Sequence, residues 1–107
     1  MSDQIMLKHI PVKATDRATH IRVNVYYDIG GGVYSNRARG YYISVFPIKE
    51  EDGLLSIEVY SGKIELLLTV SRKSKKAEAE AIQIAEARMS DLVDYVCKKN
   101  GLVLLDN

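Results

Sequence analysis

The chain has 107 residues, of which 47% are hydrophobic and 27% charged, and its formal net charge is +1. This size and balance predict a single globular domain, residues 1–107, that buries about two-thirds of its unfolded surface. A net charge so close to zero argues against non-specific nucleic-acid binding by the surface as a whole. The single cysteine, Cys97, excludes an internal disulfide.

The sequence also argues against a membrane-spanning protein and against a secreted one. No apolar run approaches the roughly 18 residues of a membrane span, and the first ten residues lack the charged and apolar regions of a signal peptide. We therefore expect a cytoplasmic protein. Because no Cys/His spacing surrounds His9 and His20, a structural zinc site is not expected, and we predict neither a metal nor a cofactor.

The first half of the chain reads as strands. Residues 5–10 form a short apolar run ended by Pro11, which predicts an edge strand or a tethered terminus, and residues 12–19 read as a polar connection. Residues 20–29 alternate apolar and polar side chains, which predicts a strand with one apolar face. Residues 39–48 predict a second strand, and we expect it to be central because both of its faces carry aromatic side chains.

Two more strands are predicted on either side of Ser61-Gly62, which has the composition of a two-residue turn. They follow an acidic turn at residues 50–53. A hairpin closed at Ser61-Gly62 pairs Val59 with Ile64, Ile57 with Leu66 and Leu55 with Leu68. Every pair is apolar and lies on one face, so the turn and the pattern agree.

The longest regular segment, residues 71–100, is predicted to form an amphipathic helix. Its apolar stripe recurs at steps of three and four and consists of Ile82, Ala85, Met89, Leu92, Val93 and Val96. Alanines crowd its first half, which should therefore approach its partner surface closely. Gly101 is predicted to end the helix, and Cys97 is expected to be a buried, inert thiol.

Four cations crowd the start of this helix, where the helix dipole disfavours positive charge. They are Arg72, Lys73, Lys75 and Lys76. One interpretation is that the helix begins near Ala77 and the cations belong to a solvated connection. The other is an anion-binding edge for a nucleic-acid backbone or an acidic partner.

The order of these elements predicts the fold class. Because the longest helix follows a run of strands and does not alternate with them, we expect an α+β domain. Its core would be an antiparallel four- or five-stranded meander sheet with one long C-terminal helix packed on one face. Residues 102–105 would add an edge strand or pack as a tail.

No catalytic signature is present, and we predict no catalytic residue. The glycines at residues 30–32 match neither GxGxxG nor GxxxxGK[ST], and they lead into a strand where a phosphate loop leads into a helix. His9 and His20 have no nearby catalytic pattern and are expected at the surface or at strand ends. An enzyme would need a pocket that brings His20 or Cys97 together with a carboxylate.

The sequence offers several side chains that could contact a partner or a nucleic acid. The loop at residues 30–38 would expose Tyr34, Asn36 and Arg37. Residues 39–46, RGYYISVF, fit the RNA-binding RRM pattern at four positions, but that fold needs a helix between its first two strands that residues 12–19 cannot supply. Tyr26, Tyr42 and Tyr60 lie on the polar parity of three strands, where they form either an exposed stripe or ordinary cross-strand packing.

Three segments, THIRVNVYYDIGGG, RGYYISVFPI and VSRKSKKAEAEA, resemble those of small uncharacterised proteins carried by bacterial conjugative and other mobile elements. They cover about a third of the chain and contain no catalytic motif. Some short accessory proteins of such elements resemble anti-CRISPR inhibitors of type II RNA-guided nucleases. The resemblance implies a protein that acts by binding a host protein or ribonucleoprotein.

The leading hypothesis is therefore a non-enzymatic, anti-CRISPR-like inhibitor of a host nucleoprotein defence enzyme. The alternative is a nucleic-acid-binding accessory module that uses a basic, tyrosine-bearing sheet face. The binding residues expected for either are Tyr34, Asn36, Arg37, Arg39, Tyr42, Arg72, Lys73, Lys75 and Lys76. Leu67, Tyr42 and Phe46 on the outward parity leave room for a homodimer through the sheet.

Overall fold

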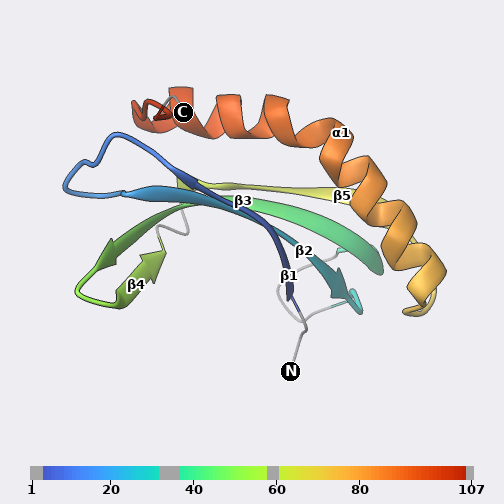
Figure 1. Ribbon diagram of the computed structural model, residues 1–107. Helices are drawn as coiled ribbons and strands as arrows, with labels where there is room; N and C mark the ends of the chain where they lie inside the picture. Colours follow the sequence, from blue (N-terminus) through green and yellow to red (C-terminus); the bar gives the residue numbers. More distant parts are fainter. Residues whose placement is uncertain (1–3, 32–36, 58–60, 106–107) are drawn as a thin grey trace.

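The computed structural model describes residues 4–31, 37–57 and 61–105. These residues form, in order, β1 (Gln4–Pro11), β2 (His20–Asp28), β3 (Gly40–Glu51), β4 (Leu54–Ile57), β5 (Lys63–Thr69) and α1 (Lys75–Asn100). All strand pairs are antiparallel, and α1 lies across one face of the sheet (Figure 1). The predicted α+β class, with one long C-terminal helix on an antiparallel sheet, is confirmed.

The long strand β3 is the centre of the sheet, as its two aromatic faces predicted. It pairs with β2 along one edge and with both β4 and β5 along the other. β1 pairs only with β2 and is an edge strand that ends at Pro11. This position suits proline, which has no N–H to give to a strand ladder.

The predicted hairpin between β4 and β5 is wrong. Ile57 pairs with Ile48 and not with Leu66, while Leu66 pairs with Tyr42 and Leu68 with Tyr41. The remaining predicted pair involves Val59, which lies outside the described residues. β4 and β5 are thus successive partners of one edge of β3, laid end to end in the same direction.

Local turn chemistry explains this pairing. Asp52 and Gly53 both have positive φ, 54° and 80°, as a two-residue type I′ turn requires, so the tight hairpin turn joins β3 to β4. Gly62 does not have a positive φ. It is instead the point where the Phe46 ring packs directly on the backbone, because a Cβ at Gly62 would overlap that ring.

The core lies between α1 and the helix-facing side of β2 and β3. Ala81 and Ala85 of the helix have no exposed surface, which confirms the close approach that the alanines predicted. The other members of this core that are at most 4% exposed are Val12, Ala18, Ile21, Val23, Val25, Tyr41, Ile43, Val45, Leu92, Val93 and Val96. Ile82 and Met89, predicted on the buried stripe, are half-buried at its flank, and Cys97 is buried as expected.

The helix begins earlier than the solvated interpretation of the cations placed it. Ser74 has extended backbone angles, and its Oγ accepts a hydrogen bond from the Ala77 N–H at 3.0 Å, which makes it the N-cap. Lys75 and Lys76 therefore belong to the first turn, and only Arg72 and Lys73 precede the helix. At the other end Gly101 adopts the left-handed conformation with φ 65°, confirming it as the stop.

The C-terminal segment returns to the sheet edge. Leu104 forms an isolated antiparallel bridge with Val12, and the Lys13 N–H donates to the Val103 carbonyl at 2.8 Å. Residues 102–105 therefore pack as a tail along the end of β1. Within the described ranges, no helix combines the length and apolar character needed to cross a bilayer.

Candidate functional site

The structure brings together the two basic segments that the sequence singled out. Arg39 donates from Nε to the Ile29 carbonyl at 2.8 Å and from Nη1 to the Ser71 carbonyl at 3.2 Å. The Val70 N–H returns a hydrogen bond to the Arg39 carbonyl at 3.2 Å. Residues 37–39, before β3, are thereby joined to residues 71–76, before α1, although about thirty residues separate them in sequence.

Around this junction lies a cluster that we call the basic end: Arg39, Arg72, Lys73, Lys75 and Lys76. All five residues are exposed. Lys73 and Lys75 line a small hollow of about 230 Å³ together with Tyr41, Ser74 and Glu78. Glu78 is the acidic residue of the first helical turn, so one carboxylate faces several cations at this end.

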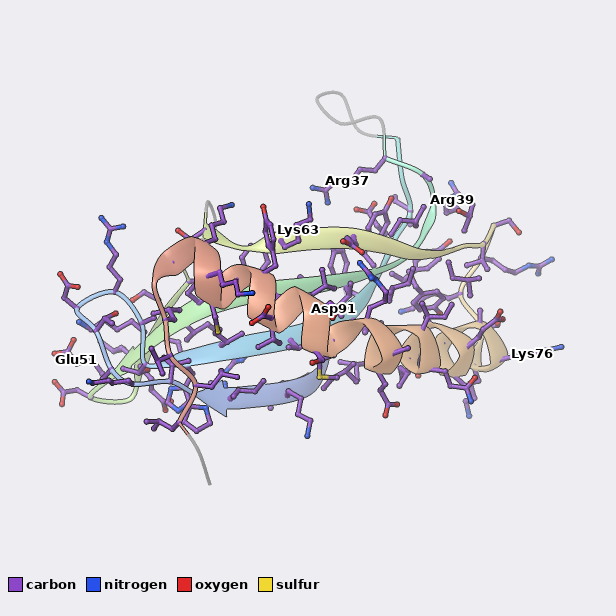
Figure 2. The ribbon with its side chains drawn as sticks, turned by 90° about the horizontal axis from the view of Figure 1, so that it is seen from above. Arg37, Arg39, Glu51, Lys63, Lys76 and Asp91 are labelled. Carbon is purple, nitrogen blue, oxygen red and sulfur yellow. The ribbon has the colours of Figure 1, made fainter. Side chains whose placement is uncertain are left out.

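The rest of the chain has the opposite balance. Beyond the basic end, the other ten Lys and Arg residues are outnumbered by fourteen Asp and Glu. Figure 2 shows Arg39 and Lys76 toward one end of the molecule and Glu51 at the opposite end. Although the net charge is only +1, positive charge is concentrated at the basic end and negative charge predominates elsewhere. This separation of charge would orient the molecule on an anionic surface.

Arg37 lies apart from the basic end. Its Nη1 is 3.7 Å from the Asp28 Oδ2 and 3.5 Å from the Tyr26 hydroxyl, and its guanidinium carbon lies 5.9 Å from the centre of the Tyr42 ring. Its charge is thus partly compensated by Asp28 and stacked on an aromatic face. Tyr34 and Asn36, predicted as contacts beside it, lie outside the described residues.

The expectation that Tyr42 is an exposed contact residue is wrong. Its side chain is only 6% exposed, its ring stacks on Tyr26 at 5.8 Å, and its hydroxyl donates to the Ala38 carbonyl at 2.6 Å. Burial raises the pKa of the Tyr26 hydroxyl, while Arg37 partly opposes that rise. Cross-strand packing is therefore the correct interpretation for this pair; Tyr60 lies outside the described residues.

The sheet face opposite α1 is concave, because the strands curve away from the helix toward both ends (Figure 1). A hollow of about 370 Å³ in it is lined by β-strand side chains that include Arg22, Asn24 and Phe46. The Asn24 Oδ1 is buried there without a hydrogen-bond partner among the described residues. Leu55, Ile57 and Leu66 are about half exposed on the same face, at 49%, 53% and 45%.

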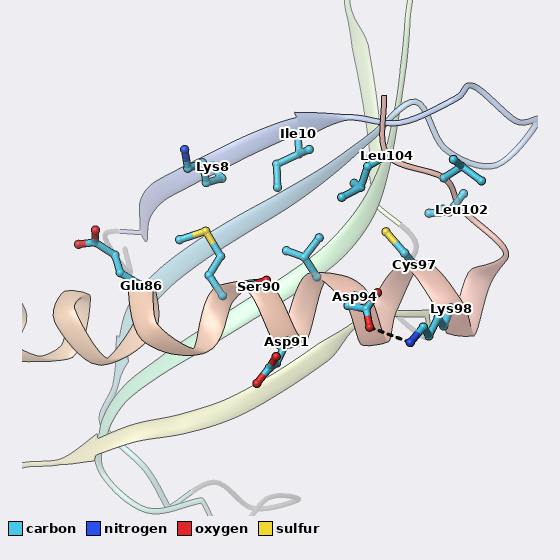
Figure 3. Close-up of a pocket in the computed structure, with 13 residues that line it drawn as sticks. Lys8, Ile10, Glu86, Ser90, Asp91, Asp94, Cys97, Lys98, Leu102 and Leu104 are labelled. Carbon is cyan, nitrogen blue, oxygen red and sulfur yellow. Dashed lines mark ion pairs between the residues drawn. The ribbon is translucent and has the colours of Figure 1, made fainter. Parts of the chain in front are cut away.

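Cys97 lines a larger groove, of about 820 Å³, between α1, the edge strand β1 and the C-terminal tail (Figure 3). The Asp94 carboxylate, which also lines this groove, forms an ion pair with Lys98 at 2.9 Å. Burial, with a smaller contribution from Asp94, raises the pKa of the Cys97 thiol. This direction favours the neutral thiol, whereas a nucleophilic cysteine requires a thiolate.

His20, at the strand end where the sequence placed it, does meet a carboxylate, which no local sequence pattern indicated. Glu50 Oε2 lies 3.7 Å from His20 Nδ1 and 3.5 Å from His9 Nε2. The Thr19 hydroxyl also contacts His20 at Nδ1, at 2.8 Å. A catalytic triad needs the hydroxyl and the carboxylate on opposite ring nitrogens, so this set does not have triad geometry.

Sequence patterns did not find this cluster because its members lie on three strands. The strand registers place His9 opposite Arg22 and His20 opposite Ile48, so the three side chains lie on a diagonal across β1, β2 and β3. Only a correct register for both strand pairs would have predicted it.

Comparison of the chain with protein family models, curated proteins and solved structures found no match.

Proposed function

We propose that this protein is a non-enzymatic binding protein of a mobile genetic element that inhibits a host RNA-guided nuclease, as anti-CRISPR proteins do. The observation that supports it best is the convergence of two basic segments into one exposed end on a molecule that is otherwise net acidic. A nucleoprotein enzyme presents phosphate groups of its bound nucleic acid. The basic end would approach such a surface first, because the charge distribution orients the molecule toward it.

A second feature supports a protein partner. The concave sheet face carries Leu55, Ile57 and Leu66 with half of their surface exposed, beside the polar hollow that contains Arg22 and Asn24. Apolar side chains framed by polar ones are typical of the core and rim of a protein interface. An inhibitor would thus use the basic end for orientation and this face for contact.

The test compares two variants with equal changes in charge. The first carries Arg72→Gln, Lys75→Gln and Lys76→Gln at the basic end; the second carries Lys13→Gln, Arg17→Gln and Lys99→Gln. Arg17 and Lys99 line one hollow at the other end of α1, and Lys13 lies beside the C-terminal tail, so the control has the same net charge elsewhere. DNA cleavage and pull-down are measured with guide-loaded and with empty type II nuclease.

We expect the wild-type chain and the control to inhibit cleavage and to form a complex, and the basic-end variant to bind at least about ten-fold more weakly, since three rim charges are lost. Absence of both inhibition and complex for the wild type removes the proposal. Equal weakening by both variants would mean that the basic end has no special role.

The second candidate function is a nucleic-acid-binding accessory module, which the same basic end favours. Fluorescence anisotropy with labelled single- and double-stranded oligonucleotides distinguishes it from the first. Affinity should fall steeply with salt, and the basic-end variant should reduce the slope of log K against log salt by roughly two to three. An absence of binding at ~50 mM salt removes this candidate.

A further inference from the structure

The only two histidines of the chain meet face to face. His9 of β1 and His20 of β2 have ring centroids 4.2 Å apart and ring planes 13° from parallel. Glu50 of β3 lies beside both rings, and the three residues can each offer a ligand atom within 4.8 Å of the others. Two imidazoles and one carboxylate on adjacent antiparallel strands form a compact donor set.

We propose that His9, His20 and Glu50 bind one divalent transition-metal ion of the zinc class. Imidazole nitrogen with carboxylate oxygen is a ligand set typical of Zn²⁺, and it also suits Ni²⁺ and Cu²⁺. Neutral imidazoles with one carboxylate supply a single negative charge to the dication. Mg²⁺ and Ca²⁺ would bind poorly, because they require six or more oxygen ligands and the cluster offers few.

The present contacts of His9, His20 and Glu50 show which side chains must move when an ion binds. The His9 Nε2 and His20 Nδ1 are the nitrogens nearest to Glu50, but the two rings are stacked and nearly parallel, so these nitrogens point side by side. Each imidazole must rotate for both nitrogens to reach one ion. At His20 the ion would replace the Thr19 hydroxyl. That hydroxyl keeps its hydrogen bond from the Glu50 N–H at 2.9 Å.

Arg22 opposes binding in the metal-free arrangement. Its Nε donates toward His9 Nδ1 at 3.4 Å, which places the ring proton on Nε2, the nitrogen that must ligate. Coordination through Nε2 moves that proton to Nδ1, where it would face the Arg22 donor. Arg22 is therefore a positioning residue whose removal should favour the metal-bound tautomer.

Three protein ligands leave one position of a tetrahedral ion for water or for a side chain of a partner. Because the ligands come from β1, β2 and β3, a bound ion would tie the edge strand to the centre of the sheet. Binding only to the folded state would raise the melting temperature in proportion to the logarithm of ion concentration. This inference does not depend on the proposed function.

The experiment uses the full chain purified without a polyhistidine tag. Isothermal titration with ZnCl2 measures affinity and stoichiometry, and visible absorption of bound Co²⁺ reports the ligand type. The variants are His9→Gln, His20→Gln and Glu50→Gln, with Glu51→Gln as the matched control, since Glu51 is the neighbouring carboxylate and pairs with Lys49. Melting of each metal-free variant verifies folding.

We expect one ion per chain, an affinity at least ten-fold lower for each ligand variant, and no change for Glu51→Gln. Arg22→Gln should bind more tightly than the wild type, a gain that a partly unfolded variant could not produce. Three outcomes would overturn the proposal: no saturable Zn²⁺ binding by the wild type, unchanged affinity in Glu50→Gln, or a thiolate absorption band for Co²⁺, which would place the ion at Cys97.

Discussion

Gly40 begins β3 at a point where the neighbouring strand leaves no room for a side chain. A Cβ at this position would overlap the backbone carbonyl oxygen of Leu68, and Gly40 is buried. The pair partner of Gly40 in β5 is Thr69, next to the bulge at Tyr41 and Tyr42. The glycine thus sets how closely β5 can approach the central strand.

Gly40→Ala should lower the free energy of unfolding by about 2 kcal/mol or more, because the obstacle is backbone that cannot rotate away. Gly31→Ala is the control. Gly31 has φ 58°, and a Cβ there would meet nothing within 4 Å. Gly31→Ala should therefore lower the free energy of unfolding by only about 1 kcal/mol, which is the strain of placing alanine in the left-handed backbone conformation. Urea unfolding measures both; an unchanged midpoint for Gly40→Ala would contradict the close approach.

The Cys97 thiol gives a pH-dependent prediction. Its pKa is raised in the folded state, mainly by burial and then by Asp94, so the unfolded chain loses the thiol proton first. The free energy of unfolding should therefore be unaffected by this group at neutral pH and should fall as pH rises above about 8.5. In the native protein the thiol should react slowly with a disulfide reagent.

Asp94→Asn should speed this thiol reaction, because it removes the carboxylate that disfavours the thiolate. Asp91→Asn is the matched control, since Asp91 lines the same groove but does not contribute to the raised pKa. Reaction rates of the native variants are compared with those in denaturant. Equal rates for Asp94→Asn and Asp91→Asn would show that Asp94 does not influence the thiol.

At the scale of elements, α1 packs tightly in its first half and with larger side chains in its second. Ala77, Ala81 and Ala85 are spaced by four and buried against the sheet, while Leu92, Val93 and Val96 fill the space farther along. Small residues allow the helix backbone to approach β2 and β3 closely. The same residues leave no volume for a larger side chain.

Ala85→Leu should lower the free energy of unfolding by about 1–3 kcal/mol, because the added carbons must displace a packed core. Ala87→Leu, two residues away on the exposed face, should change it by no more than about 0.5 kcal/mol. Both substitutions retain a good helix former, so helix propensity does not separate them. A tolerated Ala85→Leu would contradict the close approach of the helix.

At the scale of the whole molecule, we expect local stability to be highest in the core between α1 and the sheet and to decrease with distance from it. The core contains Ile21, Val23 and Val25 of β2 with Ile43 and Val45 of β3, all without exposed surface. β4 lies outside this core, and its four residues are exposed. Amide hydrogen exchange should therefore be slowest in the middle of β2 and β3 and fastest, among the strands, in β4. Equal protection of β4 and β3 would mean that another surface covers β4.

The sequence by itself determined the local elements and the faces of β2, β3 and α1. It did not determine the faces of β5, because a register shift opposite Tyr41 and Tyr42 leaves Leu66 45% exposed while Leu67 and Leu68 both pack against the core. Alternation predicted the strands at residues 20–29 and 39–48, and the 3.6-residue period predicted the helix and most of its buried stripe. Gly101 was correctly identified as its end because only a left-handed residue completes that cap. These features depend on neighbours within a few positions, so local patterns suffice to find them.

Only the tertiary structure decided which elements meet. Leu55, Ile57, Leu66 and Leu68 alternate identically whether β4 pairs with β5 or both pair with β3, because a period of two defines a face and not a partner. The burial of Tyr42 and the contact of Arg39 with Ser71 depend on which strands pair with β3, and the cluster of His9, His20 and Glu50 depends on the β1–β2 and β2–β3 registers. They join residues about ten to forty positions apart, and no local pattern encodes such distances.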